Sequence, residues 1–240
     1  YKIGGLIFFK SSPYKINQLV DRYQNISKIP LANSIDAEWG VSMRLDSCLR
    51  FPWQMTLGAI KDSSLIYEMG VNIAKQCRAL GVHINFSPVI DVNSNPNNPI
   101  INNRSFGEDP YNVAKLGLEY MRGLQDNNIL ACAKHFPGHG DTDKDSHKTL
   151  PLVNQSTERL NRIELLPYKK LISKGLSAVM IAHLEVPSLE KMQSLPTSLS
   201  YSVVTNLLKK DFGFSGLAVT DALNMHGVSN AFEPGLVDLK

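Results

Sequence analysis

The sequence predicts an α/β fold, a (β/α)8 TIM-type barrel that is incomplete in this chain, and three observations favour it. Short apolar runs alternate with segments of helical period. Each run is apolar on successive positions, as in parallel strands that helices cover on both faces. Five of the runs end in a polar or ionisable residue. Polar residues at the carboxyl ends of many strands favour a barrel over an open sheet, which binds its ligand at one switch point.

Six apolar runs are the expected strands, at 3–9, 30–36, 82–91, 129–135, 176–183 and 216–221. The segments beside them are expected helices, at 14–26, 51–60, 63–80, 109–126, 157–174 and 201–211. Several of these have recognisable beginnings; in the fourth, Asp109 is a favoured N-cap and Pro110 suits the first helical position. Six strands are two short of eight, so we expect 1–240 to be one partial barrel domain of a longer protein that has room for an additional domain.

Composition excludes several classes of protein. The net charge of +3 is small and the lysines are dispersed, so nucleic acid is not an expected partner. No apolar run approaches the roughly 20 residues of a membrane-spanning helix. The three cysteines lack CxxC spacing, so we expect buried free thiols rather than a disulfide framework or a thiolate zinc site. The first residues do not have the pattern of a signal peptide.

The loop after the fourth expected strand is the densest polar segment, with three His and three Asp between Lys134 and His147. Its proline and glycines exclude a regular helix, so His135 and His139 are not a helical metal-binding pair. Asp145 and His147 are one residue apart, so the carboxylate can fix the imidazole tautomer and leave a general acid/base. The alternative is a solvated acidic surface loop.

Asp221 closes the last apolar run, where a barrel places side chains toward its mouth. A retaining glycosidase needs a nucleophile, usually a carboxylate, together with an acid/base group, and Asp221 suits the first role. The alternative is an N-cap for a helix that begins near Ala222.

Other polar residues near strand ends are candidates for hydrogen bonds to sugar hydroxyls. They are Asp36, Arg44, Arg104 and Lys134. The alternative for Arg104 is a surface ion pair with Glu108 or Asp109. We expect Asp91 to order its own loop through Asx turns. His183 and Met225 form a second tier of candidates that line the pocket, and Trp39 is unassigned.

The run KHFPGHGDTDKDSH resembles the signature loop of the N-acetylglucosaminidase branch of glycoside hydrolase family 3. The segments SIDAEWGVSMRL, FPWQMTLGAI, NFSPVIDVNSNPNNPIINNRSFGEDP, MIAHLEVPSL and GLAVTDALNMHGV resemble further family blocks in the family order. The resemblance implies a (β/α)8-type barrel that releases terminal β-linked N-acetylglucosamine through a covalent intermediate, with no metal or organic cofactor. It assigns Asp221 as nucleophile and His147, oriented by Asp145, as acid/base. It also assigns the sugar-binding residues, which are Asp36, Arg44, Arg104, Lys134 and His135.

One departure from the family pattern is AEWG, where many members have a Gln-Glu-Gly-Gly run, so Trp39 is expected to reshape one wall of the pocket. We expect a role in cell-wall peptidoglycan turnover, and the periplasm or cell envelope rather than the cytoplasm. Three alternatives stay open. The first is phosphorolysis in place of hydrolysis, because a histidine acid/base leaves less negative charge than a carboxylate. The second is a metal-dependent hydrolase that uses His135, His139, Asp141 and His147. The third is a non-catalytic sugar-binding relic.

Overall fold

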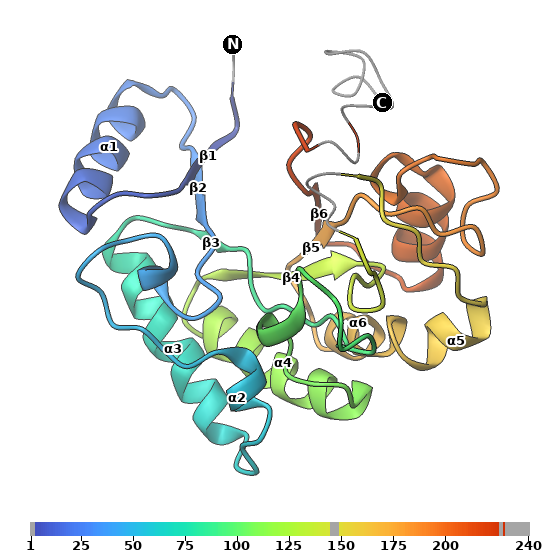
Figure 1. The fold of residues 1–240 in the computed structure, drawn as a ribbon. Coiled ribbons are helices and arrows are strands. Elements are labelled where there is room, and N and C mark those ends of the chain that lie inside the picture. Colours follow the sequence, from blue (N-terminus) through green and yellow to red (C-terminus); the bar gives the residue numbers. More distant parts are fainter. Residues whose placement is uncertain (1–2, 145–148, 226–227, 229–240) are drawn as a thin grey trace.

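The computed structural model describes residues 3–144, 149–225 and 228, and in these ranges the chain forms one curled sheet of parallel strands (Figure 1). The strands follow one another in sequence order and each pairs in parallel with the next. They are β1 (Gly5–Phe8), β2 (Ala32–Ile35), β3 (Ile84–Asn85), β4 (Leu130–Phe136), β5 (Ala178–Ile181) and β6 (Leu217–Thr220). All six predicted strands are confirmed, and the sheet is a half-barrel of the TIM type.

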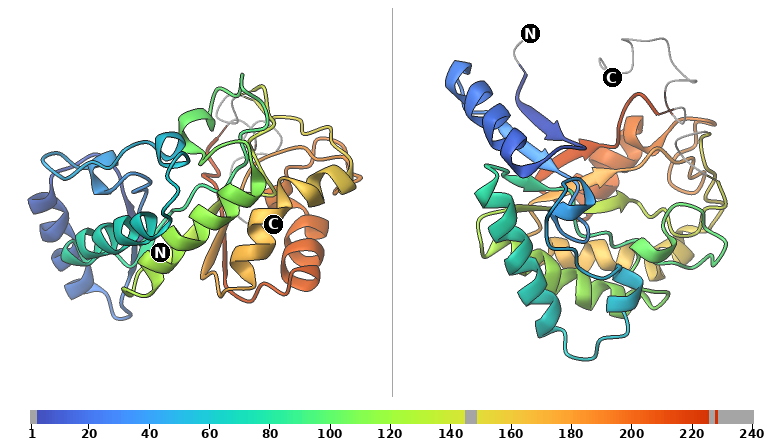
Figure 2. Two further views of the ribbon diagram at one scale, coloured as in Figure 1. Left: turned by 90° about the horizontal axis from the view of Figure 1, so that it is seen from below. Right: turned by 60° about the vertical axis from the view of Figure 1, so that its left-hand side comes forward.

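Helices cover the convex face of the sheet, and α3, α4 and α6 pack side by side along it (Figure 2). The helices are α1 (Pro13–Ile26), α2 (Gln54–Leu57), α3 (Ser64–Ala79), α4 (Pro110–Gln125), α5 (Thr157–Arg162) and α6 (Leu165–Ile172). A π-helical segment, η4, spans Ser202–Asp211. Three single turns of 3-10 helix are η1 (Val41–Met43), η2 (Asn102–Arg104) and η3 (Thr197–Leu199). The alternation of strand and helix is the one that the sequence predicts.

Local sequence explains where α4 begins and how closely it packs. The Asp109 side chain accepts a hydrogen bond from the N–H of Tyr111 at 3.0 Å, which confirms the predicted N-cap. Gly123 of α4 faces Gly70 of α3, and a Cβ at Gly123 would overlap the carbonyl oxygen of Tyr67. Two glycines at this crossing therefore allow the helices to approach closely, and fix the position of α4 against α3.

Three predicted elements differ from the structure. The predicted strand 82–91 is a strand only over Ile84–Asn85; Pro88 has no N–H to donate, and beyond it the segment returns to β4 as an isolated bridge between Val89 and Lys134. The predicted helix 157–174 is two helices, α5 and α6, separated at Glu164, whose carboxylate is buried and accepts two hydrogen bonds from Arg159 at 2.7 Å. The predicted helix 51–60 is reduced to Gln54–Leu57.

Apolar side chains on the concave side form the floor of the half-barrel. Ile84, Cys132, Ala178 and Met180 are buried together there, with the partly buried Val219 packed on them. The prediction of buried thiols is confirmed for Cys132 and Cys77, whereas Cys48 is only half-buried. No helix in the described ranges is long and apolar enough to cross a membrane.

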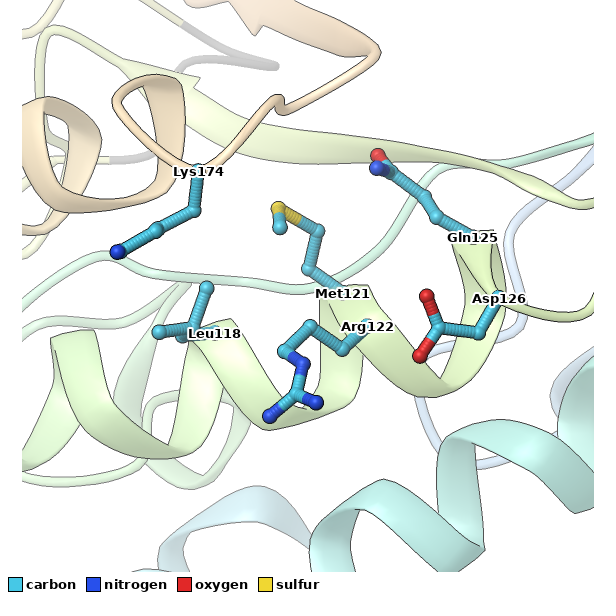
Figure 3. Close-up of a pocket in the computed structure, with 6 residues that line it drawn as sticks. All are labelled: Leu118, Met121, Arg122, Gln125, Asp126 and Lys174. Carbon is cyan, nitrogen blue, oxygen red and sulfur yellow. The ribbon is translucent and has the colours of Figure 1, made fainter.

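A separate hollow lies on the C-terminal half of α4, at the end of the molecule where the strands begin (Figure 3). It has a volume of about 310 Å³, and its lining residues are Leu118, Met121, Arg122, Gln125, Asp126 and Lys174. In barrel proteins this end contributes to stability, and the opposite end, where the strands finish, carries the chemistry.

Candidate active site

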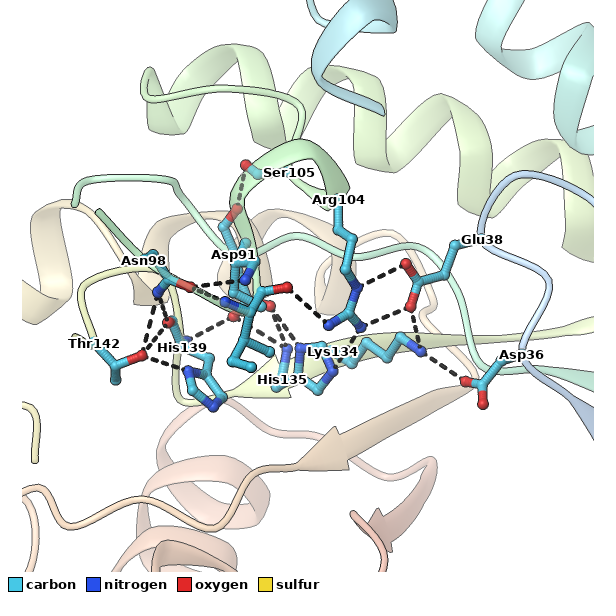
Figure 4. A network of polar contacts seen from close by, with 12 residues as sticks. Asp36, Glu38, Asp91, Asn98, Arg104, Ser105, Lys134, His135, His139 and Thr142 are labelled. Atoms are coloured by element: carbon cyan, nitrogen blue, oxygen red, sulfur yellow. Dashed lines mark hydrogen bonds and ion pairs between the residues drawn. The ribbon is translucent and has the colours of Figure 1, made fainter. Parts of the chain in front are cut away.

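The carboxyl ends of the strands surround a cavity of about 1530 Å³. Its polar lining comes from elements that are far apart in the sequence: Asp36 and Glu38 follow β2, Arg104 closes η2, Lys134 and His135 belong to β4, and Asp221 follows β6. Five of these six were candidates from the sequence. The structure therefore brings most of the predicted residues to one place, and most of them into one network of contacts (Figure 4).

Asp36 lies between two cations. Its Oδ1 is 2.7 Å from Lys134 Nζ and its Oδ2 is 2.6 Å from Arg44 Nη2. Burial by itself would raise the pKa of Asp36, but the charges of Lys134 and Arg44 outweigh it and hold the pKa below its ordinary value. The carboxylate is thus ionised, and its 13 % exposed side chain faces the cavity as a hydrogen-bond acceptor.

Glu38 was not among the candidates from the sequence, yet it joins two of them. Its side chain is completely buried and accepts from Arg104 through both oxygens, at 2.7 and 2.9 Å. Lys134 Nζ lies 2.8 Å from the same carboxylate. Burial opposes the charge, but Arg104 and Lys134 lower the pKa of Glu38 far below its ordinary range. The signal in the sequence was the spacing of Asp36 and Glu38, two residues apart at a strand end, which places both on one side of an extended chain.

Arg104 does not form the surface ion pair that was its alternative assignment. It turns inward from η2, and besides Glu38 its Nη2 lies 3.2 Å from Nε2 of His135. Arg104 pairs with Glu38 rather than with Glu108 or Asp109, because a buried carboxylate in bidentate geometry is a better acceptor than an exposed one. The charge of Arg104 is thus balanced by Glu38, while 21 % of its side chain stays exposed on the side of the cavity.

Asp91 does not order its own loop through Asx turns, so that expectation is wrong. Its buried carboxylate accepts from His135 Nδ1 at 2.7 Å and from the backbone N–H of His135 at 3.1 Å. It also accepts from the N–H of His139 at 2.7 Å. Because a carboxylate only accepts, the proton of His135 is on Nδ1, which leaves Nε2 to accept from Arg104. Asp91 thus fixes both the orientation and the tautomer of His135.

His139 supports the loop after β4. Its Nδ1 lies 2.7 Å from Thr142 Oγ1, and Asn98 donates to its carbonyl oxygen at 2.8 Å. Burial, reinforced by the nearby His135, lowers the pKa of His139 to about 4, so the ring is neutral at neutral pH. In the described residues no group of three His, Cys, Asp or Glu side chains is arranged to hold a metal ion.

Asp221 follows β6 directly and lines the cavity. Its backbone N–H donates to Ile181 at 2.9 Å, and its Oδ1 accepts from the N–H of Ala222 at 2.8 Å. Residues 223–225 form a turn and the first later residue described as helical is Val228, so Asp221 does not directly precede a helix as the N-cap alternative required. Burial would raise the pKa of Asp221, but His135, the N–H of Ala222 and Lys134 lower it below the ordinary value. The side chain is therefore an ionised carboxylate at the mouth of the half-barrel.

The two second-tier residues have different positions. Met225 lines the cavity, whereas His183 is fully buried behind it. His183 Nε2 lies 3.1 Å from the carbonyl oxygen of Ala222 and Nδ1 lies 2.7 Å from Ser198 Oγ. Both ring nitrogens are thus engaged, and His183 holds the turn that carries Asp221. Asp145 and His147, the predicted acid/base pair, lie outside the described residues.

The curled parallel sheet, with carboxylates and cations gathered in a cavity at its carboxyl ends, defines a half-barrel protein of the TIM type with a charged pocket at its mouth. The family profile "Glycosyl hydrolase family 3 N terminal domain" matches residues 1–237, and the chain belongs to this family of glycoside hydrolases.

Relatives agree with this assignment. The chain is 37 % identical over 257 residues to β-hexosaminidase A of Pseudoalteromonas piscicida, covering 98 % of this chain and 43 % of that protein. It is 29 % identical over 236 residues to a β-N-acetylglucosaminidase/β-glucosidase of Cellulomonas fimi, covering 95 % of this chain and 42 % of that protein. The structure of a family 3 β-N-acetylglucosaminidase from Paenibacillus sp. str. FPU-7 superposes with a TM-score of 0.92 at 41 % identity, covering 96 % and 45 % of the two chains. The chain thus spans about half the length of these relatives.

Proposed function

We propose that the protein containing this chain is a retaining β-N-acetylhexosaminidase that hydrolyses the bond of a terminal β-linked N-acetylglucosamine. The observation that carries the proposal is the pairing, in one cavity, of an ionised carboxylate on Asp221 with the cluster of Asp36, Glu38, Arg104 and Lys134. The cluster offers acceptors and donors to sugar hydroxyls, and the carboxylate offers a nucleophile. The name of the relative from Paenibacillus, a β-N-acetylglucosaminidase, supports the same sugar, and that of the relative from Pseudoalteromonas, a β-hexosaminidase, supports a hexosamine.

In the proposed mechanism Asp221 attacks the anomeric carbon while His147, oriented by Asp145, protonates the departing oxygen. Water, deprotonated by His147, then releases the sugar from Asp221. Asp36 accepts from hydroxyls of the bound sugar, and Lys134 and Arg104 donate to them. Glu38 and Asp36 already balance the charges of Arg104 and Lys134. These two cations therefore keep their positions while the sugar binds.

The natural substrate in this proposal is a fragment of peptidoglycan, and the protein acts in the periplasm or cell envelope. A fragment of cell wall supplies terminal β-linked N-acetylglucosamine at that location. Release of N-acetylglucosamine from purified muropeptides, followed by chromatography, tests this part of the proposal separately from the chemistry.

The experiment that tests the chemistry is release of 4-nitrophenol from 4-nitrophenyl β-N-acetylglucosaminide by the intact protein. We expect activity that survives exhaustive chelation, falls at least about a thousandfold in Asp221→Ala, falls strongly in His147→Ala, and is unchanged in Asp211→Ala, an exposed carboxylate at the end of η4. Loss of activity on chelation would instead support the metal-dependent hydrolase. An inactive wild type that still binds N-acetylglucosamine would support the sugar-binding relic.

A further inference from the structure

The segment that carries Asp221 is fastened to the end of β5 at two points. The backbone N–H of Asp221 donates to the carbonyl oxygen of Ile181 at 2.9 Å, which continues the pairing of β5 with β6. Further along the same strand end, His183 Nε2 lies 3.1 Å from the carbonyl oxygen of Ala222. The N–H of Ala222 donates to Asp221 Oδ1 at 2.8 Å, so both polar backbone groups of Ala222 are held.

The two partners of His183 define its tautomer. A carbonyl oxygen only accepts hydrogen bonds, so Nε2 carries the proton and donates it to Ala222. Nδ1 is then an acceptor, and the hydroxyl of Ser198 donates to it across 2.7 Å. The His183 side chain is fully buried, and burial lowers its pKa. The ring therefore stays neutral at neutral pH and keeps this pattern of hydrogen bonds.

The 3-10 turn η3, which carries Ser198, is anchored to the residues on either side of His183. Thr197 Oγ1 donates to the carbonyl oxygen of Ala182 at 2.7 Å and accepts from the N–H of Leu184 at 3.3 Å. The N–H of Thr197 donates to the carbonyl oxygen of Leu184 at 2.8 Å. Because Thr197 precedes Ser198 directly, these bonds fix the hydroxyl that orients the imidazole.

The position of Ala222 determines how Asp221 presents its carboxylate. The N–H of Ala222 engages Oδ1, and within the described residues no hydrogen bond reaches Oδ2, which is left available for attack. Burial would raise the pKa of Asp221, but the charge of His135 and this N–H lower it below the ordinary value. A nucleophile that is displaced by about 1 Å can lose roughly a hundredfold in rate. The hydrogen bond that fixes Ala222 thus affects both the direction and the ionisation of the carboxylate.

We infer that His183 and Ser198 are positioning residues for the nucleophile: Ser198 fixes the imidazole, and the imidazole fixes Ala222 and thereby the Asp221 carboxylate. This inference rests on the proposed function. Both side chains are buried and neither lines the cavity, so they have no contact with the sugar. Their replacement should slow the attack on the anomeric carbon without weakening the binding of the sugar.

Glutamine and asparagine in place of His183 separate its hydrogen bond to Ala222 from its bulk. The amide nitrogen of glutamine can occupy the position of Nε2, whereas the shorter asparagine reaches only the position of Nδ1. With the intact protein and 4-nitrophenyl β-N-acetylglucosaminide, we expect His183→Asn to lower kcat/KM about a hundredfold and His183→Gln less than about fivefold. Ser198→Ala, which frees the ring but keeps its donor, should lower kcat/KM about threefold to tenfold.

The matched control is His83→Asn. This histidine directly precedes β3, at the opposite end of the sheet and outside the cavity, and its Nδ1 accepts from the N–H of Asn33 at 3.0 Å. Asparagine can replace that acceptor, so His83→Asn should have wild-type kinetics.

Two further readouts distinguish positioning from a general loss of structure. The affinity for N-acetylglucosamine, measured by calorimetry, should change less than about twofold in His183→Asn. The acid limb of the pH profile of kcat/KM should move up by about one pH unit in His183→Asn and stay in place in His183→Gln, because only asparagine releases the N–H that lowers the pKa of Asp221. His135 and Lys134, the charged or titratable groups that also face Asp221, are the same in both variants.

Equal losses of kcat/KM in the two variants, an unmoved acid limb in His183→Asn, or a matching loss of sugar affinity would overturn the inference. If His183→Asn failed to fold, Ser198→Ala with wild-type kcat/KM and an unmoved acid limb would overturn it equally.

A titration of Asp221 separates the inference from the proposed function, because it requires no turnover. Carbon NMR of the intact protein, labelled at its aspartate carboxyl groups, follows the pKa, and the signal is assigned by its loss in Asp221→Asn. A wild type that releases no 4-nitrophenol, but whose Asp221 pKa rises in His183→Asn and not in His183→Gln, would contradict the proposed function and support the positioning. Hydrolysis by the wild type, with the same Asp221 pKa in His183→Asn, would do the reverse.

Discussion

Replacement of Glu38 by glutamine tests how the cationic side of the cavity is held. The side chain is 0 % exposed and accepts three hydrogen bonds, two from Arg104 and one from Lys134. Glutamine keeps the size but removes the charge, and turns an N–H₂ group toward a cationic donor. Loss of one partner of a buried ion pair costs about 3–5 kcal/mol, because the other charges remain buried without compensation.

We therefore expect Glu38→Gln to lower the free energy of unfolding by about 3 kcal/mol, since one oxygen can still accept a hydrogen bond. The matched control is Glu119→Gln, which breaks the pair with Arg122 on α4, where the arginine side chain is 52 % exposed. That exposed pair contributes at most about 1 kcal/mol. Urea unfolding of both variants at neutral pH measures the difference.

The same substitution should raise KM for the N-acetylglucosaminide, because Arg104 and Lys134 lose the group that orients them toward the sugar. If Glu38→Gln were no less stable than Glu119→Gln, the carboxylate would not be balancing two buried cations, and the reasoning would be wrong. Rearrangement of Arg104 toward another carboxylate would show as unchanged stability together with a raised KM.

Three further predictions concern the network around β4. Gly138→Ala should lower the free energy of unfolding by about 2 kcal/mol more than Gly175→Ala, as measured by thermal unfolding. Both glycines have positive φ, so the backbone strain is similar in the two variants. However, a Cβ at Gly138 would lie 2.6 Å from Glu164 Cβ, whereas nothing lies within 4 Å of a Cβ at Gly175. Equal losses would refute the clash. The lowered pKa of His139, about 4 against an unfolded value of 6.5, means that the unfolded chain binds the proton first as the pH falls. The contribution of neutral, buried His139 to the free energy of unfolding is therefore complete above about pH 6.5, and roughly 3 kcal/mol of this free energy is lost by pH 4. His139→Gln should flatten the dependence of unfolding free energy on pH in that window, and an unchanged slope would contradict the assignment. Asp91→Asn removes the acceptor that fixes the His135 tautomer, a charged hydrogen bond of about 1.5–3 kcal/mol, so kcat/KM should fall roughly tenfold or more; full activity would show that the tautomer is fixed by other means.

The strands and the convergence of polar residues at their ends could be predicted because both follow from local pattern. A parallel strand that is buried on both faces must be apolar at successive positions, and the residue where that run stops lies at the mouth of the barrel. Asp36, Lys134 and Asp221 were found in this way, and all three line the cavity.

The contacts that organise the site could not be predicted, because they join residues distant in sequence. Glu38 meets Arg104 across 66 positions and Asp91 meets His135 across 44, and nothing local to either pair indicates its partner. The break between α5 and α6 has a similar cause: Glu164 is buried beneath Gly138, so tertiary packing ends a segment that is helical by its own periodicity. The sequence pattern indicates which face of a helix or strand is buried and where the element ends, whereas the curl of the sheet determines which strand ends lie close together.

In the proposed retaining mechanism Asp221 is the nucleophile, and it should carry the sugar as a covalent intermediate. The most direct measurement is mass spectrometry of peptides from the intact protein after reaction with a slow-turnover substrate, a 5-fluoro-N-acetylglucosaminyl fluoride. We expect a covalent sugar adduct on the peptide that contains Asp221, and no adduct in Asp221→Ala. An adduct on a different residue, or hydrolysis by Asp221→Ala at the wild-type rate, would contradict the claim.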